Sequence, residues 1–293
     1  MVTTRIGGWS VRTLETGLFR LDGGAMFGTV PKVMWSRLSE PDERNRIRLA
    51  LRCLLLEGHG RRVLVDVGIG GKFPPKLVDI YGIEADGSVL AGALAGAGLG
   101  PADITDVLIT HFHFDHAGGS TRREGGRLVP ALPNARYHVQ EQNLANARDP
   151  NPRERASYLP ENLEPLLEAG VLEAWEGPGS PWPGLEVLVF HGHTRGQQGI
   201  RLAGPEGVLY YVADLIPTAA HVRIPFVMGY DVSALESMQE KRALLERAAA
   251  ERAWIVLEHD PEIAAARPRV EGDDFAWEER AGSAAGALSP GGS

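Results

Sequence analysis

A dense cluster of metal-ligating side chains lies near the middle of the chain and limits the folds available to it. Three histidines and one aspartate occur within six residues, at His111, His113, Asp115 and His116. They follow residues 106–110, a short apolar run that predicts a buried strand. Alternate residues of an extended chain point to the same side, so His111, His113 and Asp115 are expected to converge while His116 turns to a neighbouring point. Imidazole and carboxylate groups suit zinc and similar divalent ions, so the sequence predicts a metal site at the end of this strand.

Three further candidate ligands each follow another predicted strand. They are His193 after residues 185–190, Asp214 after 208–213 and His259 after 253–257. Polar groups at strand ends are held in place by the rigid sheet, so these three are expected on the same rim as the first cluster. Seven ligands suffice for two divalent ions that share a carboxylate and keep a position open for water. Zinc is the expected metal, and manganese, iron, cobalt and nickel also suit such ligands.

The rest of the chain alternates between strand-like and helix-like segments, which indicates a layered α/β or α+β fold. Strands are expected at 49–56, 62–67, 106–110, 136–139, 185–190, 208–213 and 253–257, and helices at 88–99, 153–169 and 233–252. The helix at 153–169 is expected to break at Pro160 and at Pro165. Residues 1–280 are expected to form one domain. Residues 281–293, dominated by Gly, Ala, Ser and Pro, are expected to be a disordered tail.

Charge and composition exclude several classes of function. The 38 acidic and 30 basic residues give a net charge of −8, which argues against binding to a nucleic-acid backbone. The sequence contains no run of about 18 apolar residues that would span a membrane. The first ten residues lack the apolar core of a secretory signal, and the single cysteine, Cys53, fits a reducing compartment. These features predict a cytoplasmic protein that binds neither membrane nor nucleic acid.

The motifs resemble those of the metallo-β-lactamase-fold hydrolase superfamily. The likeness rests on His-Phe-His-Phe-Asp-His at 111–116, Gly192-His193-Thr194, Ala213-Asp214, Glu258-His259 and the Asp-x-Gly strand end at 66–68. The resemblance implies an α+β fold, a four-layer αββα sandwich with its site at one edge. It further implies that a first ion is held by His111, His113 and His193, a second by Asp115, His116 and His259, with Asp214 as the bridge. Asp66 is expected to hydrogen-bond behind the ligand loop.

Within that superfamily the chain resembles the branch that holds N-acyl-homoserine lactonases. The similar segments are 22–28, 30–35 and 214–218 together with His221. In the expected reaction a metal-bridged water loses a proton near neutral pH and attacks a lactone or other carboxylic ester, while Asp115 accepts or relays the proton. Well-known lactonases place a tyrosine three residues after the bridging aspartate, where this chain has Pro217. Tyr230 or His221 is the expected replacement, so the predicted catalytic side chains are Asp115, His221 and Tyr230.

Two other reactions suit similar ligands. Hydrolysis of phosphodiesters or phosphotriesters also uses two ions, for in-line displacement. Persulfide dioxygenases share the ligand motif and hold one iron through two histidines and an aspartate.

A small-molecule ester or lactone is the expected binding partner. Met26, Phe27, Met34 and Trp35 are expected either to form an apolar lid over its acyl chain or to pack in the core or a homodimer contact.

Overall fold

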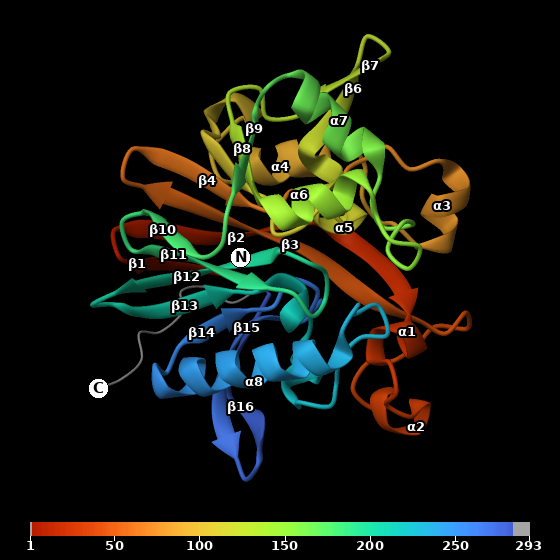
Figure 1. The fold of residues 1–293 in the computed structure, drawn as a ribbon, viewed down its shortest axis with the longest axis vertical. Coiled ribbons are helices and arrows are strands. Elements are labelled where there is room, and N and C mark those ends of the chain that lie inside the picture. The colour runs from red at the N-terminus through yellow and green to blue at the C-terminus, as the bar shows by residue number, and fades with distance from the viewer. Residues whose placement is uncertain (1, 284–293) are drawn as a thin grey trace.

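Two seven-stranded sheets lie face to face in the computed structural model, which describes residues 2–283 (Figure 1). The first sheet has the order β1 (Thr3–Ile6), β2 (Trp9–Asp22), β3 (Arg46–Gly58), β4 (Arg61–Val65), β5 (Asp106–Leu108), β8 (Arg136–Gln140) and β9 (Leu172–Trp175). The second has the order β10 (Gly179–Trp182), β11 (Leu185–Phe190), β12 (Gln197–Gly204), β13 (Gly207–Tyr211), β14 (Trp254–Val256), β15 (Ile263–Glu271) and β16 (Asp274–Gly282). Strands β6 (Thr121–Glu124) and β7 (Arg127–Pro130) form a separate two-stranded sheet.

The core between the sheets accounts for the apolar runs in the sequence. Trp9 and Leu54 from the first sheet belong to the same buried cluster as Ile200 and Tyr211 from the second. Strand β3 is buried along the whole of residues 49–56, because its opposite face lies under helices. A strand covered on both faces reads as a continuous apolar run instead of an alternating one, which is the pattern found there.

Helices cover the outer face of each sheet and complete the four layers (Figure 1). Leu94, Leu144 and Leu166 pack from α4, α6 and α7 against the first sheet, and Leu245 and Ala248 pack from α8 against the second. The longer helices are α4 (Val89–Gly96), α6 (Glu141–Arg148), α7 (Pro160–Glu168) and α8 (Ala234–Ala250). The shorter ones are α1 (Gly23–Phe27), α2 (Lys32–Trp35), α3 (Pro75–Ile80) and α5 (Phe114–Ala117), with 3-10 turns η1 (Pro101–Asp103), η2 (Gly118–Ser120), η3 (Ala213–Leu215) and η4 (Ala219–Val222). The predicted α+β, αββα sandwich is confirmed.

The helix predicted over 153–169 is shorter than expected. The side chain of Asn151 accepts hydrogen bonds from the backbone N–H groups of Arg153 and Glu154, at 2.9 and 3.2 Å, and so holds this segment in a turn. Helix α7 starts only at Pro160, because a proline favours the first helical position and disfavours a helical residue before it. Pro165 lies inside α7 and does not break it.

The folded part of the chain also ends later than predicted. Strand β16 reaches Gly282, because the backbones of Ala281 and Gly282 pair with β15 at Ala265 and Ile263. Main-chain pairing of this kind is independent of the small side chains that suggested a tail from 281. Residues 284–293 lie outside the described residues. Within the described part of the chain, no helix has both the length and the apolarity needed to cross a membrane.

Candidate metal centre

The seven predicted ligands meet at one edge of the sandwich, where strands from both sheets end. His111, His113, Asp115 and His116 lie on the loop and short helix after β5, His193 follows β11, Asp214 lies in η3 after β13, and His259 follows β14. None of these residues exposes more than 8% of its surface. The fold therefore brings together ligands that are far apart in the sequence and come from both halves of the molecule.

The one-turn helix α5 divides the first cluster in two. The backbone of His113 is extended, and α5 begins at the next residue. The helical turn ends at His113 the alternation that the sequence suggested through Asp115, and it places Asp115 and His116 with His259, although the ring of His116 stays beside that of His111 with centroids 4.0 Å apart. The resulting ligand groups are His111, His113, His193 and Asp214 on one side and Asp115, His116 and His259 on the other.

In the first group, ring nitrogens face one another. Nε2 of His111 lies 3.0 Å from Nδ1 of His113, and Nε2 of His193 lies 3.2 Å from that same Nδ1. Oδ2 of Asp214 lies 3.1 Å from Nε2 of His193. Ligand atoms bound at about 2.0–2.1 Å to a tetrahedral zinc ion are about 3.3 Å apart, so these spacings fit a single divalent ion.

The second group lies next to the first and shares Asp214 with it. Nε2 of His116 and Nε2 of His259 are 3.3 Å apart, and Oδ2 of Asp115 lies 3.8 and 3.7 Å from them. Asp214 reaches this group too, with Oδ1 at 3.1 Å from Nε2 of His259 and Oδ2 at 3.5 Å from Nε2 of His116. The donor set thus fits two divalent ions with Asp214 between them.

Asp66 lies directly behind the second group, in the place that the sequence predicted. Its buried carboxylate accepts hydrogen bonds from the backbone N–H and the hydroxyl of Thr110, both at 2.7 Å. Oδ2 of Asp66 also lies 3.1 Å from Nδ1 of His116. A carboxylate behind a ligand histidine fixes the ring tautomer and raises the basicity of the nitrogen that binds the metal.

Two other groups that orient ligands were missed by the sequence analysis. Oδ1 of Asp231 lies 2.9 Å from Nδ1 of His193. Nδ1 of His259 lies 2.8 Å from the carbonyl oxygen of Ala50 and donates its hydrogen bond there. A single aspartate in a loop and a main-chain carbonyl leave no pattern in a sequence, so neither contact was predictable without the fold.

Charges inside the centre set the protonation of its histidines. Burial alone would lower the pKa values of His193 and His259, but the adjacent Asp214 carboxylate raises them to about 10 and about 9. Burial lowers the pKa of His111, and the neighbouring histidines lower it further. Protons on His193 and His259 must leave before those nitrogens can bind an ion, so metal affinity should increase with pH.

A cavity of about 280 Å³ opens onto both ligand groups. Its floor is formed by His113, Asp115, His193, Asp214 and His259. Its walls include apolar side chains from four parts of the chain, namely Leu21, Met26, Phe114 and Met228, and the phenols of Tyr81 and Tyr230. Burial raises the pKa of Tyr230, so its phenol keeps its proton at neutral pH. Asp115 and Tyr230, two of the three predicted catalytic side chains, thus both line this cavity.

His221, the third predicted catalytic residue, lies elsewhere. It is 1% exposed, and its ring stacks on Phe27 with centroids 4.8 Å apart. Nδ1 lies 2.7 Å from the hydroxyl of Thr218, and Nε2 lies 2.9 Å from the carbonyl oxygen of Met26. Both ring nitrogens therefore have hydrogen-bond partners away from the cavity. The prediction that His221 is a polar group of the cavity is wrong, and its role is structural.

The apolar residues predicted as a lid are also divided by the fold. Met26 lines the cavity, whereas Phe27 and Trp35 are buried and stack on each other with ring centroids 5.4 Å apart. Met34 is exposed. Only Met26 of the four is therefore placed to contact a substrate at the cavity wall.

The burial of His221 predicts a loss of stability in acid. Burial lowers its pKa from 6.5 to about 4, so between these values the unfolded chain binds more protons than the folded one. The contribution of the buried, neutral His221 to the unfolding free energy is fully present above pH 6.5. It should fall by about 2 kcal/mol between pH 7 and pH 5. Denaturant unfolding of wild type and His221→Gln, both with chelator, measures it. A wild-type protein that loses no more stability than His221→Gln over this range would contradict the prediction.

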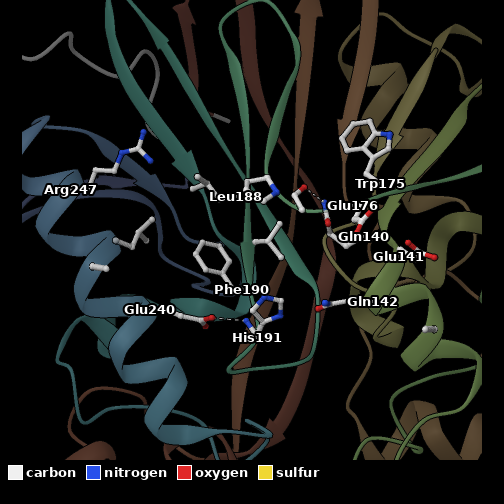
Figure 2. Close-up of a pocket in the computed structure, with 16 residues that line it drawn as sticks. Gln140, Glu141, Gln142, Trp175, Glu176, Leu188, Phe190, His191, Glu240 and Arg247 are labelled. Carbon is white, nitrogen blue, oxygen red and sulfur yellow. Dashed lines mark hydrogen bonds between the residues drawn. The ribbon is translucent and has the colours of Figure 1, made fainter.

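A second and larger hollow, of about 840 Å³, lies between α8, β11 and the ends of β8 and β9 (Figure 2). His191 faces this groove and not the ligand groups, although it stands only two residues before His193. Glu240 of α8 accepts hydrogen bonds from the backbone N–H groups of His191 and Gly192, at 2.7 and 3.0 Å. The groove thus borders the back of the loop that carries His193.

Comparison with known proteins finds solved structures of the same fold and related sequences. A probable metal-dependent hydrolase from Staphylococcus aureus has a solved structure that matches with a TM-score of 0.88 and 29% identity, covering 96% of this chain and 99% of that one. An N-acyl homoserine lactonase from Bacillus cereus is 26% identical, covering 74% of this chain and 84% of its own. A dizinc quorum-quenching lactonase has the same fold, with a TM-score of 0.79 and 18% identity, covering 95% of this chain and 97% of that one.

The sequence model of the Metallo-beta-lactamase superfamily matches residues 49–259. This match spans most of the chain and includes every ligand from His111 to His259. The protein therefore belongs to the metallo-beta-lactamase superfamily and is a metal-dependent hydrolase.

Proposed function

We propose that the protein hydrolyses a small lactone or another small carboxylic ester and uses two divalent ions, with zinc as the expected metal. The observation that carries this proposal is the pair of ligand groups sharing Asp214 at the floor of one cavity. Two adjacent ions polarise a carbonyl and activate water for attack when they are bound in such a site. The lactonase from Bacillus cereus supports the lactone as the substrate class.

The cavity walls provide for both ends of an acylated lactone. Leu21, Met26 and Met228 offer an apolar surface to an acyl chain. Pockets for small molecules usually measure about 300–1,000 Å³, so a cavity of about 280 Å³ favours short chains. N-acyl-homoserine lactones with short chains are accordingly the leading candidates.

Two side chains at the floor and wall would take part in proton transfer and hydrogen bonding. Asp115 lies beside His116 and His259 and faces the cavity, where its carboxylate would accept a proton during the attack on the ester. The protonated phenol of Tyr230 would donate a hydrogen bond to the substrate carbonyl or to the leaving oxygen. Tyr230 would thus take the place of the tyrosine that known lactonases have at the position of Pro217 in this chain.

Proton release from a panel of γ-lactones, including acyl-homoserine lactones of increasing chain length, tests the proposal. We expect zinc-loaded protein to turn over the short-chain members. We also expect His113→Ala to lose about 100-fold in turnover, because removing a direct ligand should cost at least as much as losing a group that supports one. The variant Glu164→Gln, which changes an exposed side chain of α7, is the control.

Two results would contradict the proposal. One is equal turnover by wild type and His113→Ala, which would place the reaction outside this centre. The other is absence of lactone turnover when both ions are confirmed bound. In that case phosphotriester hydrolysis, and thiol-dependent oxygen consumption by iron-loaded protein, are the assays that separate the remaining reaction classes.

A further inference from the structure

A buried glutamate lies behind one ligand of the centre and belongs to the segment 151–158, between α6 and α7. This segment forms part of the cavity wall through Arg153, Ala156 and Ser157. Glu154 is 3% exposed, whereas the residues on either side of it are exposed. A carboxylate withdrawn from water in this way needs partners, and the structure supplies them from two directions.

One oxygen of Glu154 faces His113. Oε1 lies 3.6 Å from Nε2 of His113, and within residues 2–283 neither atom has a hydrogen-bond partner elsewhere. His113 turns its other nitrogen, Nδ1, toward His111 and His193. A neutral histidine that binds an ion through Nδ1 carries its proton on Nε2. The donor that this proton creates therefore points at Glu154.

The other oxygen of Glu154 is held by amides. Oε2 accepts a hydrogen bond from Nδ2 of Asn146 at 3.2 Å and another from Nδ2 of Asn151. Nδ2 of Asn146 also lies 3.1 Å from the hydroxyl of Thr194, which is adjacent to the ligand His193. The carboxylate is thereby fixed in a network that joins the His113 loop to the His193 loop.

We propose that Glu154 is a positioning residue for the metal centre, which holds His113 in the Nδ1-binding tautomer and raises the basicity of that nitrogen. Asp66 lies behind His116 at 3.1 Å and Asp231 behind His193 at 2.9 Å, and Glu154 is the carboxylate that faces the corresponding nitrogen of His113, at 3.6 Å. The residue also couples the cavity wall to a ligand, because its neighbour Arg153 donates a hydrogen bond across the cavity to the carbonyl oxygen of Gly229.

Metal binding without substrate tests this role, so its outcome is independent of whether the substrate is a lactone. We expect Glu154→Gln to weaken binding of Zn²⁺ by about 10- to 100-fold, measured by competition with a chromophoric chelator. The ligand-field spectrum of the Co²⁺-substituted protein should shift, because the electron donation of His113 changes. Glu154→Asp keeps the charge at a greater distance from the ring and should give an intermediate affinity. Glu164→Gln is the control, since this α7 side chain is exposed.

A merely structural role would give a different pattern. It predicts that the metal-free variants lose unfolding free energy while the Co²⁺ spectrum stays that of wild type, so chelator-treated samples are unfolded in parallel. Should Glu154→Gln fail to fold, Glu154→Asp carries the comparison with the same two readouts. Wild-type Zn²⁺ affinity and an unchanged Co²⁺ spectrum in whichever variants fold would overturn the proposal.

Discussion

Asp214→Asn should abolish the dinuclear centre and lower turnover by about 1,000-fold. Among residues 2–283, Asp214 is the one residue whose oxygens reach both ligand groups, with Oδ2 at 3.1 Å from Nε2 of His193 and Oδ1 at 3.1 Å from Nε2 of His259. An amide carries no negative charge and offers a single acceptor oxygen, so it cannot serve both groups and binds an ion more weakly than the carboxylate. Because the loss of a group that merely supports a ligand costs 10- to 100-fold, the loss of a ligand common to two ions should cost more. Atomic emission spectroscopy gives the ions per chain, and the turnover assay gives the rate.

His259→Ala is the matched variant for this prediction. It removes a ligand from the second group alone and leaves His111, His113, His193 and Asp214 in place. We expect about one ion per chain in His259→Ala and less than one in Asp214→Asn. Two tightly bound ions in Asp214→Asn would show that this residue is not shared between them.

Lys241→Met should lower the unfolding free energy by about 2–4 kcal/mol, because it removes the side-chain donor from the buried carbonyl oxygens of His221 and Phe226. The carbonyl oxygen of Arg223 keeps a hydrogen bond from the backbone N–H of Phe226. Lys241 of α8 is completely buried, and Nζ donates to the carbonyl oxygens of His221, Arg223 and Phe226 at 3.1, 2.9 and 2.6 Å. Methionine fills a similar volume but offers no donor. The loss is measured by denaturant unfolding of metal-free protein.

Lys76→Met provides the control, because Lys76 is an exposed lysine of α3. The segment fastened by Lys241 continues directly into Met228, Tyr230 and Asp231, which line the cavity or support His193. We therefore expect Lys241→Met to weaken metal binding as well. A variant as stable as Lys76→Met would contradict the proposed anchoring.

The ligands were predictable from sequence because they lie in short segments that follow apolar strands. The end of a strand can be predicted from the residues next to it, and the sandwich fold places these strand ends at one edge. The rotation of Asp115 away from His111 was not predictable by alternation, since it depends on the single helical turn of α5. Glu154, Asp231 and Lys241 also gave no signal, because their partners lie in other segments of the chain.

Several strands were missed for a related reason. Strands β15 and β16 contain Ala, Arg and Glu, residue types that favour helices, and register shifts lie beside Pro268 and Ala265. Strand β2 is interrupted by an irregularity between Glu15 and Leu18 that breaks its alternation. In each case pairing with a neighbouring strand decides the structure, and a sequence read alone does not contain that neighbour.

The order of the ligands along the chain has a consequence for synthesis. The first ligand is His111 and the last is His259, so 148 positions separate them in sequence although they share one centre. A growing polypeptide acquires the first sheet's four ligands well before those of the second. The complete set of ligands is therefore present only after His259 has left the ribosome, when most of the chain has already been synthesised.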